Sequence, residues 1–122
     1  MQETYIEEIL KELTLEEKIG MIHGAGLFRT EGVERLSIPP LYMSDGPMGV
    51  RAEFADNEWR NVGTTEDYVT YLPCNSAIAS TWNRDLAKKA GEVLGEEARG
   101  RGKDGILAPG INIKRSPICG RN

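Results

Sequence analysis

Two short helices at the start of the chain are predicted by the spacing of its apolar residues. Thr4 with Glu7, and Thr14 with Glu17, have the Thr-x-x-Glu spacing of a capping box, in which the threonine hydroxyl accepts from a backbone N–H one turn along. The apolar residues recur every three or four positions, which places them on one face of each helix: Ile6, Ile9, Leu10 and Leu13, and then Leu15, Ile19 and Ile22. We therefore expect two amphipathic helices, the second ending near Gly24.

Short apolar runs and one long amphipathic helix follow. Residues 41–44 come directly after Pro39-Pro40 and are a strand candidate, because a strand can start after such a pair but cannot run through it. Residues 77–79, 106–108 and 111–113 are further strand candidates, and the polar stretch 53–70 predicts a surface loop. Asn83 is a predicted helix cap, and an apolar stripe at helical spacing comes after it: Leu86, Ala90, Val93, Leu94 and Ala98.

The alternation of strands with helices favours an α/β fold built from parallel strands. The chain has 122 residues, whereas a complete eight-stranded α/β barrel needs roughly 250. In parallel sheets, polar residues just past the carboxyl end of a strand are candidates for function. Asp45 occupies such a position, and so do Arg115 and Arg121.

Composition and charge narrow the range of functions. Lys and Arg total 15 against 19 Asp and Glu, a net charge of −4, so we expect no nucleic-acid partner and no membrane partner. The N-terminus lacks the basic segment and apolar run of a signal peptide, which predicts a cytoplasmic location. Cys74 and Cys119 form no disulfide framework and are interpreted as buried, reduced thiols. His23 is the single histidine, and no residue pattern indicates a metal or an organic cofactor.

The candidate chemistry lies in the segment Ser44-Asp45-Gly46-Pro47, with Arg51 six residues after the aspartate. A carboxylate can accept hydrogen bonds from vicinal hydroxyls, and a guanidinium donates in a planar fork. The pair would therefore suit a neutral polyhydroxyl ligand such as a sugar. From spacing alone, a structural ion pair between Asp45 and Arg51 that closes a loop is the favoured alternative.

Several motifs, in order along the chain, resemble glycoside hydrolase family 3. Residues 13–21 are similar to the family's opening helix, and Ser44-Asp45-Gly46-Pro47 with Val50-Arg51 resembles its substrate-binding loop. The resemblance runs from about residue 12 to the C-terminal Gly120-Arg121-Asn122. The other segments that carry it are residues 72–73, 79–83, 95–99, 107–113 and 115–117.

The resemblance implies a fold and an activity. It implies that residues 1–122 are the N-terminal portion of a (β/α)8 barrel domain, with a helical lead-in over about 1–26 and barrel elements over about 36–122. The parent activity would be retaining hydrolysis of terminal, non-reducing β-D-glucosyl residues. Asp45 would bind hydroxyls of the terminal sugar, and Arg51 and Arg121 would border the same subsite.

The same resemblance implies that the catalytic groups lie elsewhere. The family's nucleophilic aspartate and acid/base glutamate match no position in this chain, so we expect no catalytic residue within it and no turnover by the segment alone. The expected partners are a β-glucoside or related oligosaccharide and the missing C-terminal part of the same enzyme. Two alternatives remain: a non-catalytic sugar-binding fragment, and a subunit that a second chain completes.

Overall fold

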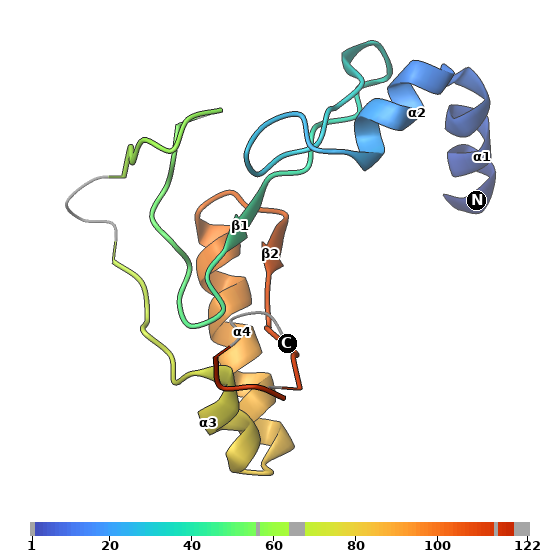
Figure 1. Cartoon of the computed structure of the whole chain (residues 1–122). Helices are drawn as coiled ribbons and strands as arrows, with labels where there is room; N and C mark the ends of the chain where they lie inside the picture. The colour runs from blue at the N-terminus through green and yellow to red at the C-terminus, as the bar shows by residue number, and fades with distance from the viewer. Residues whose placement is uncertain (1, 56, 64–67, 114, 119–122) are drawn as a thin grey trace.

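The computed structural model describes residues 2–55, 57–63, 68–113 and 115–118, and Figure 1 shows their arrangement. The helices and strands, in chain order, are α1 (Gln2–Glu12), α2 (Leu15–Ile22), a 3-10 turn η1 (Glu34–Leu36), β1 (Met43–Asp45), α3 (Asn75–Ser80), α4 (Arg84–Gly100) and β2 (Gly105–Leu107). None of the helices in these ranges is long and apolar enough to cross a membrane.

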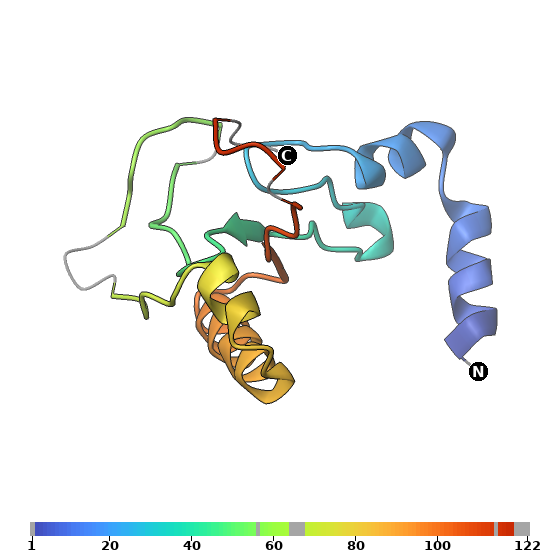
Figure 2. The same cartoon turned by 60° about the horizontal axis from the view of Figure 1, so that its bottom comes forward.

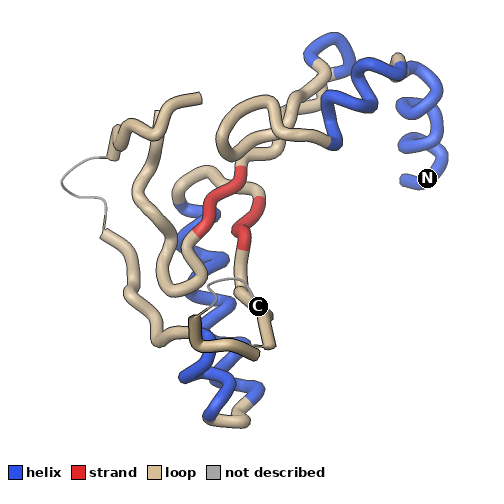
Figure 3. Tube along the Cα trace, viewed as in Figure 1, coloured by secondary structure: helices blue, strands red, loops and turns tan. Residues whose placement is uncertain are grey.

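The centre of the molecule is a strand–helix–strand unit. β1 and β2 pair in parallel, with Met43 opposite Gly105 and Asp45 opposite Leu107. Figure 3 shows the two strands side by side, with α4 leading back from the far end of the unit to the start of β2. This confirms the predicted α/β class and the parallel pairing, and the described residues form a small α/β unit rather than a complete barrel.

The core lies where α4 packs on the segments that flank the strands. Val50, Leu72, Leu94 and Ala98 form its buried cluster. Each fully buried aliphatic side chain of the size of valine or leucine contributes about 1.5–3 kcal/mol. Because Val50 and Leu72 come from the loops after β1, this small core fixes the loop that carries the candidate chemistry.

The two N-terminal helices form a lead-in that lies apart from the strand–helix–strand unit in both views (Figures 1 and 2). α2 begins as predicted: the Thr14 hydroxyl accepts from the Glu17 N–H, and the Glu17 carboxylate accepts from the Thr14 N–H at 2.8 Å. The predicted cap at Thr4 is wrong, because α1 already begins at Gln2 and Thr4 lies inside it. The division into a lead-in over about 1–26 and barrel elements over about 36–122 stays a prediction.

Two of the predicted strands are also wrong. Residues 77–79 lie in the helix α3, in keeping with the helical preference of alanine, and residues 111–113 have no regular structure. A short apolar run does not distinguish a strand from a helix, so length and neighbours decide. Cys74 is exposed rather than buried, and Cys119 lies outside the described residues.

A pH-sensitive ion pair joins α2 to the 3-10 turn η1. Arg35 Nε and an Nη of the same guanidinium donate to the two carboxylate oxygens of Glu17 at 2.7 and 2.6 Å. These hydrogen bonds, together with the one from the Thr14 N–H, lower the pKa of Glu17 from 4.5 to about 2. A lowered pKa in the folded state means that the unfolded chain takes up the proton first. Glu17 therefore stabilises the fold fully above its unfolded pKa, and this contribution is lost as the pH falls through about 2.

We expect an NMR titration of the Glu17 carboxyl group to have its midpoint near 2, because Arg35 holds the charged form. Arg35→Gln removes both hydrogen bonds from the guanidinium and is expected to raise this midpoint toward 4.5. A midpoint near 4.5 in the unsubstituted chain would show that the pair does not form in solution.

Candidate functional site

Asp45 lies at the carboxyl end of β1, where the chain leaves the sheet. Its neighbour Ser44 is completely buried, while the Asp45 side chain is 43% exposed. Alternate residues of a strand point to opposite faces, so burial of Ser44 directs the Asp45 side chain to the other side of the sheet. The acidic group is therefore held by a buried strand but remains accessible to a ligand.

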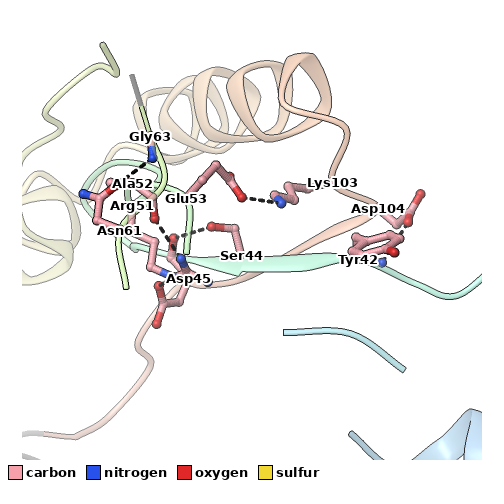
Figure 4. Close-up of polar contacts among 10 residues, drawn as sticks. All are labelled: Tyr42, Ser44, Asp45, Arg51, Ala52, Glu53, Asn61, Gly63, Lys103 and Asp104. Carbon is pink, nitrogen blue, oxygen red and sulfur yellow. Dashed lines mark hydrogen bonds and ion pairs between the residues drawn. The ribbon is translucent and has the colours of Figure 1, made fainter. Parts of the chain in front are cut away.

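Asp45 and Arg51 turn toward one another, as Figure 4 shows. Arg51 Nε lies 2.6 Å from Asp45 Oδ1. The Nε–H bond is poorly aligned with this contact, which makes it an ion pair rather than a hydrogen bond. The Arg51 side chain is only 18% exposed, and an Nη group donates to the Ala52 carbonyl oxygen at 2.8 Å.

A tight turn brings the arginine back beside the aspartate. The Gly49 N–H donates to the Gly46 carbonyl oxygen at 3.2 Å, and the Arg51 N–H donates to the Asp45 carbonyl oxygen at 3.2 Å. Gly46 has a φ of 109°, which residues with a Cβ rarely adopt. A Cβ at this position would also overlap the Gly49 carbonyl oxygen, so the turn requires glycine for two reasons.

The segment that precedes α3 links this turn to α4 through two sets of hydrogen bonds. The Leu72 N–H donates to the Met48 carbonyl oxygen at 2.7 Å. Two residues earlier, the Thr70 hydroxyl donates to a Glu97 carboxylate oxygen at 2.5 Å, and the Thr70 N–H donates to the same carboxylate. Glu97 on α4 thereby ties the turn to the core helix.

The structure brings together two of the three predicted site residues. Asp45 and Arg51 are in contact, whereas Arg121 lies outside the described residues. Arg115, at the end of the described chain, is exposed. Within the described ranges, His, Cys, Asp and Glu side chains form no group of three that could hold a metal ion.

Sequence reasoning missed the aromatic residues around Arg51. The guanidinium carbon lies 3.7 Å from the centroid of the Phe28 ring and 4.6 Å from that of Phe54. Phe28 is 23 positions upstream of the arginine, and no periodicity or motif connects the two. Arginine often packs on aromatic rings, but this general preference could not predict that Phe28 and Phe54 are the rings in contact.

Comparison with known proteins shows the family. The model of the glycosyl hydrolase family 3 N-terminal domain matches residues 9–122. The chain belongs to glycosyl hydrolase family 3. This family 3 chain is 47% identical, over 120 residues, to the β-glucosidase BoGH3A of Bacteroides ovatus. The match covers 98% of this chain and 16% of that relative, so the chain spans about a sixth of the relative's length.

Two solved family 3 structures have the same local fold. A structure of β-glucosidase 3B from Thermotoga neapolitana in complex with α-D-glucose matches with a TM-score of 0.78 and 37% identity, covering 96% of this chain and 18% of that one. The β-glucosidase of Kluyveromyces marxianus in complex with glucose matches with a TM-score of 0.74 and 33% identity, covering 92% of this chain and 12% of that one. The likeness is therefore to one segment of much longer enzymes.

Proposed function

We propose that this chain is the opening segment of a retaining glycoside hydrolase that removes terminal, non-reducing β-D-glucosyl residues, and that Asp45 binds hydroxyls of that sugar. Membership of family 3 and the likeness to two glucose-bound β-glucosidases support the reaction class. The observation that carries the role of this segment is the half-exposed carboxylate at the carboxyl end of a parallel strand.

The Asp45 carboxylate has acceptor capacity left for a sugar. The ion pair with Arg51 engages Oδ1, and within the described part of the chain no side chain donates to Oδ2. A carboxylate has about four lone-pair sites, which is enough to accept from two neighbouring hydroxyls while the ion pair persists. Hydrogen bonds to a charged acceptor contribute about 1.5–3 kcal/mol each. Arg51, and Arg121 from the C-terminal end, would border the same subsite.

Hydrolysis itself would depend on groups outside this segment. Retention needs a carboxylate nucleophile and an acid/base carboxyl group about 5 Å apart, and proceeds through a covalent glycosyl-enzyme. We assign neither role to Asp45, because its carboxylate is held in the ion pair with Arg51. In the proposal, Asp45 orients the sugar so that the anomeric carbon meets a nucleophile from the rest of the enzyme.

The remainder of the enzyme would seat in an apolar groove. A cavity of about 880 Å³ opens between α3, α4 and the segment after β2. Ile111 and Ile113, which line it, are 85% and 76% exposed. Exposed apolar patches of this kind usually mark a surface that another part of a protein covers. Most of its lining is apolar or small, including Ile78, Ala79, Ala90, Leu94, Ile106 and Ala108. We propose that further strands and helices of the barrel cover this groove.

A chimera tests the proposed function. Residues 1–122 replace the matching 120-residue segment of the Bacteroides ovatus relative, and hydrolysis of an aryl β-glucoside is measured. We expect turnover by the chimera and none by residues 1–122 alone. Mixing residues 1–122 with the remainder of the relative, expressed as a separate chain, is expected to restore part of the activity if the groove receives that remainder.

Each other outcome contradicts a named part of the proposal. Turnover by residues 1–122 alone would overturn the placement of the catalytic carboxylates elsewhere. A chimera that folds and binds glucose without hydrolysing the substrate would favour a non-catalytic sugar-binding role. A folded chimera with neither property would show that this segment supplies no functional sugar site.

A further inference from the structure

We propose that Arg51 is a positioning residue, which acts on the sugar through Asp45, and that Phe28 and Phe54 hold its guanidinium in the required place. This inference rests on the proposed function and deepens it. It assigns to Arg51 a contact with the carboxylate rather than with the sugar, and it assigns a role in the site to two aromatic residues.

The surroundings of Arg51 leave it little access to a sugar. Its side chain is 18% exposed, against 43% for Asp45, and its guanidinium carbon lies over the rings of Phe28 and Phe54, 3.7 and 4.6 Å from their centroids. The cavity that Arg51 lines has a volume of only about 40 Å³. That is room for one or two water molecules, whereas ligand pockets measure about 300–1,000 Å³. The accessible group of the pair is therefore the carboxylate.

The two phenylalanine rings come from segments that are themselves fixed. Phe28 is held against β1, because the Met43 N–H donates to its carbonyl oxygen at 2.7 Å. Phe54 lies on a short hairpin, in which the Val62 N–H donates to the Glu53 carbonyl oxygen at 2.9 Å. The Trp59 ring meets both phenylalanines edge-on, with centroid distances of 5.9 Å to Phe28 and 5.4 Å to Phe54.

A second ion pair anchors the hairpin beside the arginine. Lys103, in the turn between α4 and β2, donates to Glu53 at 2.7 Å, and its side chain is only 14% exposed. Figure 4 shows this pair beside Ser44, with Arg51 and Ala52 on the side of Glu53 away from Lys103. The segment that carries Phe54 is thus tied to the turn after α4, and Phe28 is tied to β1.

The arrangement has a functional consequence. A guanidinium that packs on two rings has less freedom to rotate, so the carboxylate paired with it is held in one orientation. Hydrogen bonds to sugar hydroxyls depend on that orientation. A substitution that lets the Arg51 guanidinium move should therefore weaken only the hydrogen bonds that the Asp45 carboxylate accepts from the sugar.

A double-mutant cycle in the chimera tests this coupling. Arg51→Gln is expected to lower kcat/KM for an aryl β-glucoside by about 10- to 100-fold when Asp45 is present. In the Asp45→Asn background the same substitution is expected to change kcat/KM less than threefold, because the group through which it acts is gone. Arg51→Lys should not restore activity, since a lysine lacks the planar fork and the stacking surface.

Phe54→Leu keeps an apolar side chain but removes the aromatic face. This variant tests the same positioning role if the Arg51→Gln chimera does not fold. We expect it to lower kcat/KM by about 3- to 10-fold with Asp45 present and to have no further effect in Asp45→Asn. Glu92→Gln, on an exposed part of α4, is the control and should leave both backgrounds unchanged.

The outcomes separate this inference from the proposed function. A loss from Arg51→Gln or Phe54→Leu that is equally large with and without Asp45 would overturn the positioning role. If Asp45→Asn itself left kcat/KM unchanged in a folded chimera, the proposed sugar-binding role of Asp45 would fail instead.

Discussion

Replacing Asp45 by alanine is expected to lower kcat/KM of the chimera for an aryl β-glucoside by about 10²- to 10⁴-fold. The substitution removes the acceptor of two charge-assisted hydrogen bonds, worth together about 3–6 kcal/mol, and each 1.4 kcal/mol corresponds to about a factor of ten. It also leaves the Arg51 guanidinium without its counter-ion among the described residues. The measurement is steady-state kinetics, with circular dichroism to show that the variant is folded.

Glu92→Gln is the matched control for this experiment. It also removes a carboxylate, but one that lies on the exposed face of α4 and that, among the described residues, pairs with Lys88 and Lys89. Exposed pairs of this kind contribute about 0–1 kcal/mol, so activity should change little. An Asp45→Ala variant that is folded and as active as this control would contradict the role given to Asp45.

Gly46→Ala is expected to abolish activity and to lower the melting temperature or the soluble yield of the chimera. At a φ of 109° a residue with a Cβ is strained, which costs about 1–3 kcal/mol. The new methyl group would in addition overlap the Gly49 carbonyl oxygen and approach the Arg51 nitrogen to 2.9 Å. The turn would have to open, and the ion pair between Asp45 and Arg51 would open with it.

Gly95→Ala is the matched control, because it makes the same chemical change where the structure has room. Gly95 lies inside α4, and a Cβ there would meet nothing within 4 Å. Alanine in a helix interior is favoured over glycine by about 0.5–1 kcal/mol. Equal effects of the two substitutions would show that the backbone of Gly46 is not constrained as described.

The elements that the sequence predicted correctly are those governed by nearby residues. The capping box at Thr14 and Glu17 formed, and the Asn83 side chain accepts from the Asp85 and Leu86 N–H groups at the start of α4. Both signals act within one helical turn, so no tertiary contact is needed to read them. The wrong strands at 77–79 and 111–113 were short apolar runs, whose structure depends on what packs against them.

For the candidate site, the sequence predicted the pair of residues but not the aromatic rings around the arginine. The position of Asp45 after a short strand and its spacing from Arg51 pointed to the pair that the structure contains. The spacing could not show that the arginine packs on the rings of Phe28 and Phe54. The contact with Phe54 depends on residues 53–55 pairing with residues 60–62, in a stretch whose polar composition indicated only a surface loop.

The most direct test of the central claim, that Asp45 binds the sugar, is a crystal structure of the chimera with glucose bound. The account predicts an Asp45 carboxylate oxygen within about 2.5–3.0 Å of at least one sugar hydroxyl, with Arg51 still paired to the same carboxylate. Glucose bound elsewhere, with Asp45 facing only Arg51 and no sugar atom within hydrogen-bond distance, would contradict it.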